Sequence, residues 1–363
     1  MKNGVDELDI ISEFDAEDSD ETPNLYEHYR FEVDKGQSLM RIDKYLTNIM
    51  AGVSRNRIQD AADAAQILVN GKSVKSNYKV KPKDTITIVL AYPPSEFNII
   101  PQDIPIKITY EDEHIILVNK QPGLVVHPGF GNFEGTLLHA VAYHLKDVPG
   151  FDANDSKVGL VHRIDKDTSG LVLLAKTPEA KTNLGKQFFD KTTDRTYNAL
   201  VWGNVKEDSG TIEGALARDP RDRMLFTVFP EGENPLAKHA VTHYKVIERL
   251  GYVTLVECRL ETGRTHQIRV HMKHIGHTLF NDARYGGNEI LKGNRTAKYQ
   301  QFVKNCFEIC PRQALHARTL GFNHPTTGQY MNFDSELPDD ITQLIEKWRR
   351  FAGITGTTDI EKD

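Results

Sequence analysis

The stretch His162-Arg163-Ile164-Asp165-Lys166-Asp167-Thr168-Ser169-Gly170 leads directly into the apolar run Leu171–Ala175. The apolar run predicts a buried strand, and the polar residues before it predict a turn. Turns held by a rigid scaffold are common places for catalytic groups, so the carboxylate of Asp165 is a candidate for chemistry. A polar turn whose Asp and Ser side chains bond their own backbone explains these nine residues equally well, and the choice depends on the rest of the chain.

The overall composition predicts a soluble, globular, cytoplasmic protein. The chain has 363 residues, 39% hydrophobic and 26% charged, and this length favours two domains. Its apolar runs are too short to span a bilayer, and its acidic beginning lacks the pattern of a secretory signal. Cys258, Cys306 and Cys310 are few and odd in number, which indicates a reducing compartment rather than a disulfide framework.

Charge is distributed unevenly along the chain. Residues 1–24 carry nine acidic side chains and one lysine, so the formal charge of −6 is the sum of −8 here and +2 in the rest. Low aromatic content and high charge predict that this segment is a disordered tail, and residues 352–363 are predicted to form a C-terminal tail. The acidic tail has two interpretations, a solubilising segment or a competitor of nucleic acid for a basic surface.

Residues 31–92 are predicted to form a small α/β domain. Apolar residues recur at helical spacing from Leu39 to Ile49, and a second helix is predicted from Arg55 into Ala65. Asn70-Gly71 is a strong hairpin signal, and the alternating residues Thr85–Leu90 predict a further strand.

The same segment is basic, with ten Lys and Arg against six Asp and Glu. A basic face on a small domain suggests contacts with phosphate groups, although a solvated surface is the usual place of lysine. The candidate RNA-binding residues in this domain are Arg41, Lys44, Arg55 and Lys72.

Residues 93–105 contain four prolines and are predicted to form a stiff linker to a second domain, residues 106–351. This domain mixes strands and helices, with strands more numerous. The predicted strands are Ile115–Asn119, Leu171–Lys176, Thr196–Trp202, Val241–Ile247, Val253–Leu260 and Leu315–Phe322. The predicted helices are Thr136–Leu145, Glu179–Phe189, Thr265–His274 and Pro338–Phe351, the last with an apolar face that includes Phe351. We therefore expect an α+β domain on a mostly antiparallel mixed sheet.

Polar motifs occur at four further places in this domain. They are Asn119–Gly129, Arg195–Val201, Thr262–Met272, and Gln313–Ala317 followed by His324-Pro325. Together with His162–Gly170, and in this order, they resemble the RluA-type pseudouridine synthases and in particular their RluD branch. Residues 31–92 resemble the RNA-binding domain first described in ribosomal small-subunit protein four, although Ala65-Gln66 occupies the place of that family's usual glycine.

The resemblance implies isomerisation of specific uridines to pseudouridine in RNA, most closely large-subunit ribosomal RNA or its precursor. It implies that Asp165 is the catalytic carboxylate, that Arg269 is its ion-pair partner, and that Tyr197 faces the target base. An opposite charge within ~4–6 Å would keep a buried carboxylate ionised. Arg163 is expected to fill the gap left by the extruded base, and His162 and Arg264 are further candidates for contacting RNA.

Other functions are compatible with parts of this pattern. The same motifs occur in transfer RNA pseudouridine synthases, and a binding-only RNA chaperone would also keep this fold. Glycosidases need two carboxyl groups, and Asp167, two positions after Asp165, would point elsewhere, which argues against a hydrolase.

The histidines from His266 to His277 lack the spacing of a zinc site, and the glycines after Pro128 miss the dinucleotide pattern. We therefore expect a monomer with no metal, no cofactor and no membrane partner.

Overall fold

The chain folds into two compact units. The first comprises Met1–Gln102, His127–Tyr143 and Asp152–Ser156, and the second comprises Asp103–Val126, His144–Phe151 and Lys157–Asp363. The computed structural model describes residues 26–50, 55–90, 99–128, 132, 134–149, 151–153, 159–222, 225–230, 232–294 and 296–353. The predicted acidic tail, part of the predicted linker and nearly all of the predicted C-terminal tail therefore lie outside the described residues.

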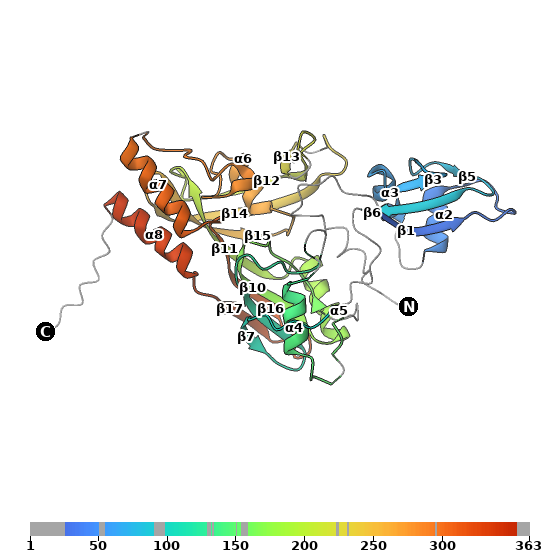
Figure 1. Cartoon of the computed structure of the whole chain (residues 1–363), viewed down its shortest axis with the longest axis horizontal. Coiled ribbons are helices and arrows are strands. Elements are labelled where there is room, and N and C mark those ends of the chain that lie inside the picture. The colour runs from blue at the N-terminus through green and yellow to red at the C-terminus, as the bar shows by residue number, and fades with distance from the viewer. Residues whose placement is uncertain are drawn as a thin grey trace. The chain divides into compact units, whose positions relative to one another are not determined.

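The small N-terminal part combines two helices with short strands, as the sequence predicts (Figure 1). Its elements are β1 (Tyr26–Glu32), β2 (Met40–Arg41), α2 (Ile42–Ile49), α3 (Arg55–Asp63), β3 (Ile67–Val69), β4 (Lys72–Ser73), β5 (Lys79–Val80) and β6 (Thr85–Leu90). One sheet has the order β1-β6-β3-β4, and β2 pairs with β5. Residues Ile42 and Leu46, one helical turn apart, are both fully buried in its core, which explains the apolar spacing of α2.

The turn after α3 forms without a glycine. Ala65 takes the left-handed conformation with φ of 58°, and the amide of Gln66 donates to the carbonyl of Ala61 at 2.9 Å. This hydrogen bond closes the helix end. The left-handed conformation, which glycine adopts without strain, costs an alanine roughly 1 kcal/mol. The replacement of the family's usual glycine therefore leaves the local turn intact.

The second unit is built on one large mixed sheet, which confirms the predicted α+β class. Its strand order is β13-β12-β14-β15-β11-β16-β10-β8-β7, with β17 beside β16 and β9 beside β10. Its strands are β7 (Lys107–Glu111), β8 (Ile115–Lys120), β9 (Gly159–Leu160), β10 (Ser169–Ala175), β11 (Asp194–Trp202), β12 (Ser209–Arg218), β13 (Phe226–Phe229), β14 (Lys238–Arg249), β15 (Val253–Leu260), β16 (Leu315–Asn323) and β17 (Tyr330–Asp334). The strands predicted from the sequence are all present, with ends that differ by up to three residues.

The pairing of β10 with β16 is parallel, whereas the neighbouring pairings in this sheet are antiparallel. Gly170 lies at this junction opposite Ala317 and has a φ of 116°. A Cβ atom on Gly170 would lie 2.1 Å from the carbonyl oxygen of Ala317, so the backbones can approach only because residue 170 is glycine. The glycine that ends the opening motif thus joins the two halves of the sheet.

The second unit also holds α5 (Pro178–Phe189), α6 (Gln267–His274), η1 (Ala283–Tyr285), α7 (Ala297–Ile309) and α8 (Asp339–Ala352), whereas α4 (Leu137–His144) lies largely in the first unit. α5 packs against β10 and β16, and α6 contacts β12, β13 and β14 (Figure 1). α7 lies beside α8, and both bury side chains in one cluster around Trp202 and Trp348. Phe351 is 41% exposed, but its ring contacts Trp348 and stacks on Phe302, so it lies on the apolar face of α8 as predicted.

Candidate active site

Asp165 and Arg269 meet in the second unit although they are far apart in the chain. The Nη1 atom of Arg269 donates to Oδ2 of Asp165 at 2.9 Å, and the side chains of Arg269 and Asp165 are 7% and 18% exposed. Asp165 lies on the turn before β10, closed by a bond from the amide of Thr168 to the carbonyl of Asp165, and Arg269 lies in α6. The ion pair expected from the sequence is present, and Arg269 is a buried residue rather than a surface one.

Arg269 also binds a second carboxylate, Asp282, which the sequence analysis missed. Its Nε donates to Oδ2 of Asp282 at 2.8 Å and its Nη2 to Oδ1 at 3.0 Å. The side chain of Asp282 is 1% exposed, and its Oδ1 also caps the short helix η1 by accepting from the amide of Tyr285. Two parallel bonds fix the plane of a guanidinium, so Asp282 leaves Nη1 directed at Asp165.

The positive charges around Asp165 keep it ionised. Burial opposes its charge, but His266, Arg269 and Arg163 act against burial and lower the pKa of Asp165 to about 2. Burial lowers the pKa of His266 itself to about 3, so this imidazole is neutral at pH 7. The lasting positive charges are therefore those of the two arginines.

A hydrogen-bond chain orients the imidazole of His266. The amide of Phe226 donates to the Tyr285 hydroxyl at 3.2 Å, and that hydroxyl lies 2.8 Å from Nδ1 of His266. Burial raises the pKa of Tyr285, which keeps its proton in place.

Tyr197 lies on β11 close enough to Asp165 and Arg195 for their charges to act on its hydroxyl. The residue is 8% exposed, and no hydrogen bond to its hydroxyl is present within the described part of the chain. Burial raises the pKa of Tyr197 above its usual value, so the side chain is a neutral phenol at pH 7. A neutral ring is suited to stacking on a base, whereas removal of a proton by Tyr197 would first require its own deprotonation.

Two buried basic side chains hold the Asp165 turn, Lys120 at the end of β8 and Arg312 in the segment before β16. Nζ of Lys120, at the end of β8, donates to the carbonyls of Lys166, Leu124 and Gln121 at 2.7, 2.8 and 3.0 Å. Arg312 donates to the carbonyl of Asp167 at 2.8 Å, and its guanidinium is anchored by Asp340. These hydrogen bonds fix the position of the turn and therefore of the Asp165 carboxylate.

The other candidates near the turn take different places. The amide of Leu173 donates to Nε2 of His162 at 2.9 Å, and the imidazole stacks on Phe188. Burial lowers the pKa of His162 to about 3, so its partly exposed imidazole is neutral at pH 7. Arg264 precedes α6 and donates from Nε to the carbonyl of His239, and Arg163 is partly exposed beside Asp165.

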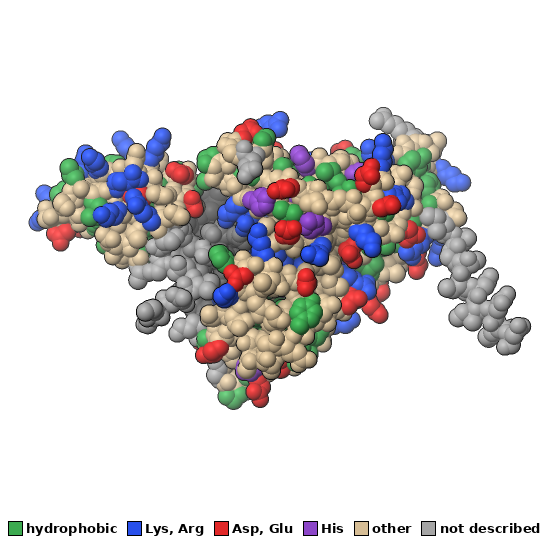
Figure 2. Space-filling view, turned by 180° about the vertical axis from the view of Figure 1, so that it is seen from behind, with side chains coloured by type: hydrophobic (Ala, Val, Ile, Leu, Met, Phe, Trp, Pro, Cys, Tyr) green, Lys and Arg blue, Asp and Glu red, His purple; other side chains and the backbone are tan. Residues whose placement is uncertain are grey.

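The candidates in the small N-terminal part divide into two pairs. Arg41 and Arg55 both bind the buried Asp43, with Nη2–Oδ2 distances of 2.9 and 3.1 Å, and remain about half exposed. Burial raises the pKa of Asp43, but hydrogen bonds from Arg41, Gln59 and Arg55 outweigh it and hold that pKa far below its usual value. Lys44 and Lys72 are exposed, on a unit over which Lys and Arg side chains gather (Figure 2).

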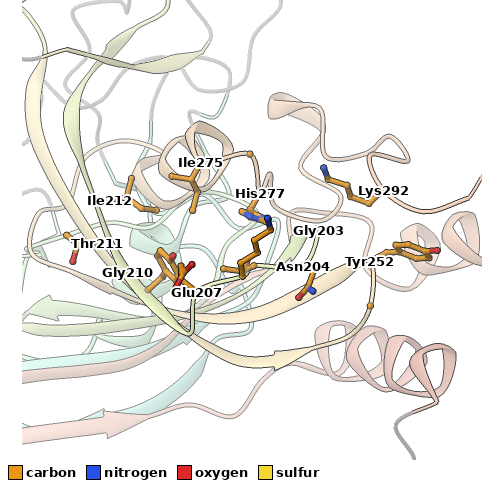
Figure 3. Close-up of a pocket in the computed structure, with 15 residues that line it drawn as sticks. Gly203, Asn204, Glu207, Gly210, Thr211, Ile212, Tyr252, Ile275, His277 and Lys292 are labelled. Carbon is orange, nitrogen blue, oxygen red and sulfur yellow. The ribbon is translucent and has the colours of Figure 1, made fainter.

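A surface pocket of about 820 Å³ lies at another place in the second unit (Figure 3). Its charged and titratable lining residues include Lys206, Glu207, His277 and Lys292. Asp165, Tyr197 and Arg269 do not line it, so this pocket is separate from the candidate site. Within the described residues, no group of three His, Cys, Asp or Glu side chains could hold a metal ion, and no helix there is long and apolar enough to cross a membrane.

Comparison with known proteins identifies the class to which this fold and site belong. The RNA pseudouridylate synthase family matches residues 114–274, and the S4 domain family matches residues 40–86. An RNA pseudouridine synthase of Chlorobaculum parvum is 45% identical over 319 residues, which are 88% of this chain and 97% of the relative. The chain therefore belongs to the RNA pseudouridine synthases, which are isomerases, and it carries an N-terminal RNA-binding S4 domain.

Two further relatives carry a more specific name, ribosomal large subunit pseudouridine synthase D. The protein of Zymomonas mobilis is 39% identical over 84% of this chain and 93% of its own, and that of Vibrio vulnificus is 38% identical over 88% and 94%. The solved structure of human RNA pseudouridylate synthase domain containing 4 covers 67% of this chain and 93% of its own, with a TM-score of 0.50 at 21% identity, which supports the fold.

Proposed function

We propose that this enzyme converts specific uridines of large-subunit ribosomal RNA to pseudouridine, with Asp165 as its catalytic carboxylate. The substrate class is supported by the relatives named for the large ribosomal subunit, which match over most of the chain. The observation that carries the role of Asp165 is its buried ion pair with Arg269, on a turn held from two sides. A low pKa, a fixed position and a neighbouring cation are what a carboxylate needs to act at a developing positive charge.

The proposed reaction is balanced without a co-reactant. The bond from N1 of uracil to C1′ of ribose breaks, the base turns, and a bond from C5 to C1′ forms. C5 loses its proton and N1 gains one, so substrate and product have the same atoms. The ionised Asp165 serves either by attacking the sugar or by assisting elimination of the base, and both routes require the charge that Arg269 and Arg163 preserve.

Extrusion of the target nucleotide precedes this chemistry, because a base within a helix cannot reach a buried carboxylate. We assign Tyr197 to stacking on the extruded uracil, since its ring is neutral and lies near Asp165. We assign Arg163 to the gap left in the RNA, since it is partly exposed and next to Ile164 at the entrance to the turn. Unstacking costs roughly a few kcal/mol, which planar side chains help to recover.

The S4 domain supplies phosphate contacts in this proposal. Lys44 and Lys72 are exposed, and Arg41 and Arg55 keep exposed surface while Asp43 fixes their positions. The chain then divides as the sequence suggests, into an acidic tail (1–24), an RNA-binding domain (31–92), a linker (93–105), a catalytic domain (106–351) and a C-terminal tail (352–363). We further propose that the enzyme works as a monomer in the cytoplasm.

The substrate is tested by mapping pseudouridines in total RNA from cells with and without this protein. Loss of modification in large-subunit ribosomal RNA, restored by the wild-type chain, is the expected result. Loss confined to transfer RNA would overturn the substrate while leaving the enzyme class intact. If no uridine changed in either RNA, a binding-only RNA chaperone would become the better account.

A further inference from the structure

Arg195 is a buried cation that has no anionic partner among the described residues. It is 7% exposed, and within the described residues it makes no hydrogen bond and no salt bridge. Its Nε atom is fully buried and has no hydrogen-bond partner there. Arg269 and Arg312, which are also buried in this unit, differ because each is bound bidentately by an aspartate.

An unpaired buried charge is costly, and proteins normally pair it or bind something to it. Arg195 is compensated in part by the ring of Phe188, whose centroid lies 5.5 Å from the guanidinium carbon. Such a contact contributes about 1 kcal/mol, less than the penalty for burying a cation. Since the described residues offer no anion to Arg195, we look for its counter-charge in a ligand.

The position of Arg195 places it beside the candidate active site. Burial alternates along the start of β11, so that Thr193, Arg195 and Tyr197 are buried while Asp194 is exposed. The charge of Arg195 acts on the hydroxyl of Tyr197 and on His162. Arg195 and Tyr197 therefore share one face of the strand, and Tyr197 is the side chain close to Asp165.

Two further features describe the surroundings of Arg195. The Oγ1 atom of Thr193 is buried and, like Nε of Arg195, has no hydrogen-bond partner in the described part of the chain. A Cβ atom on Gly263 would lie 2.8 Å from Nη1 of Arg195, so the glycine lets the guanidinium lie against its backbone. Polar groups of this kind, left unsatisfied at a functional face, are satisfied when the ligand arrives.

We propose that Arg195 binds a phosphate of the RNA backbone adjacent to the target uridine. The proposal rests on the proposed function, because it takes RNA as the molecule that enters this face. A phosphodiester supplies the negative charge that Arg195 lacks, whereas a uracil carbonyl would leave the cation uncompensated. A guanidinium also matches phosphate through two parallel bonds, and this geometry would fix the register of the nucleotide beside Tyr197 and Asp165.

The first test measures RNA affinity against salt concentration. The Asp165→Asn variant is used as the common background, so that no turnover occurs during binding. Arg195→Met in this background should reduce the slope of log K against log salt by roughly 0.7–0.9, the value for one phosphate contact. Arg249→Met is the matched control, because Arg249 is already paired with Asp208, and its slope should stay unchanged. An unchanged slope for Arg195→Met would overturn the proposal.

The second test locates the phosphate. Single methylphosphonate linkages, which carry no charge, are placed in turn beside the target uridine. At one position the uncharged linkage should reduce RNA affinity by about tenfold or more in the protein with Arg195 and have little effect on the affinity of Arg195→Met. The loss of affinity in Arg195→Lys should be intermediate. Equal loss in all three proteins at every position would contradict the assignment.

Thermal melting of the free protein separates ligand binding from a structural role. Removing an unpaired buried cation should leave the melting temperature of Arg195→Met unchanged or raise it. A lowered melting temperature together with an unchanged salt slope would show that Arg195 serves the fold and would refute the proposal. If Asp165→Asn kept normal turnover while the Arg195 results held, the catalytic assignment would fail and the phosphate site would stand.

Discussion

Arg269 donates two hydrogen bonds to Asp282 and one to Asp165, and the doubly bonded partner is the more deeply buried of the two. The geometry makes Asp282 the anchor of the guanidinium and leaves Asp165 at its free end. The three groups together carry one negative charge, so Arg269 supports the ionised form of Asp165 without cancelling it. Asp282 is a positioning residue in this account.

Replacing Asp282 by Asn should lower kcat by about 10- to 100-fold with little change in RNA affinity, because the amide loses one strong bond and the fixed direction of Nη1 is relaxed. The Oδ1 acceptor that caps η1 is kept in Asp282→Asn, so the fold should survive. Single-turnover release of tritium from RNA labelled at C5 of uridine measures the chemical step. Glu248→Gln, which disrupts the bidentate pair with Arg349 elsewhere, is the control and should be near wild type.

A double-mutant cycle gives the sharper result. Asp282 acts through the guanidinium fork, so adding Asp282→Asn to Arg269→Lys should cost much less than it does in the wild type. Fully additive losses in kcat would mean that Asp282 acts independently of Arg269, and the positioning role would be wrong.

Lys120 makes stability depend on pH. Burial lowers the pKa of its amine to about 7 in the folded protein, from an ordinary value of 10.5 in the unfolded chain. Between pH 7 and 10.5 the amine of Lys120 is protonated in the unfolded chain and neutral in the folded protein. The buried charge therefore lowers the free energy of unfolding at low pH, and this loss is relieved as pH rises from about 7 to 10.5. The free energy of unfolding of the wild type, measured relative to Lys120→Met, should therefore increase with pH across this window. A difference that stays flat or falls over the same range would show that the amine keeps its ordinary pKa.

Gly170 should tolerate no side chain. Gly170→Ala places a methyl group 2.1 Å from the Ala317 carbonyl and forces alanine to a φ of 116°, so we expect a loss of stability on the order of 3 kcal/mol. Chemical denaturation of both proteins measures it. Gly185→Ala in α5 is the matched control, because nothing lies within 4 Å of the added atom, and it should stabilise by about 0.5–1 kcal/mol. Similar behaviour of the two variants would contradict the close approach of β10 and β16.

The sequence was sufficient where the signal is local. Thr168, Ser169 and Gly170 precede an unbroken apolar run, and this change from polar to apolar located both the turn and β10. The resemblance of the motifs indicates Asp165, Tyr197 and Arg269 from sequence alone. Periodicity likewise identified α2, α3 and β6 of the S4 domain, whereas β1 (Tyr26–Glu32) was not predicted.

What the sequence could not show depends on contacts between distant residues. Asp282 follows α6 in a stretch with no recognised pattern, and its role appears only when Arg269 folds back onto it. The helix α7 is not among the predicted helices, and its buried side chains pack beside α8. The sequence also cannot show that Arg195 lacks a partner, because this depends on its burial and contacts in the folded structure.

The central claim is that the ionised carboxylate of Asp165, which Arg269 positions and keeps ionised, is the catalytic group of the isomerisation. Asp165→Asn removes that charge and keeps the size of the side chain, and Asp167→Asn makes the same change two residues away on the same turn. We predict that Asp165→Asn binds RNA with near wild-type affinity and releases no tritium from uridine labelled at C5, while Asp167→Asn releases it at a rate close to wild type. Release by Asp165→Asn within a few-fold of the wild-type rate would contradict the account.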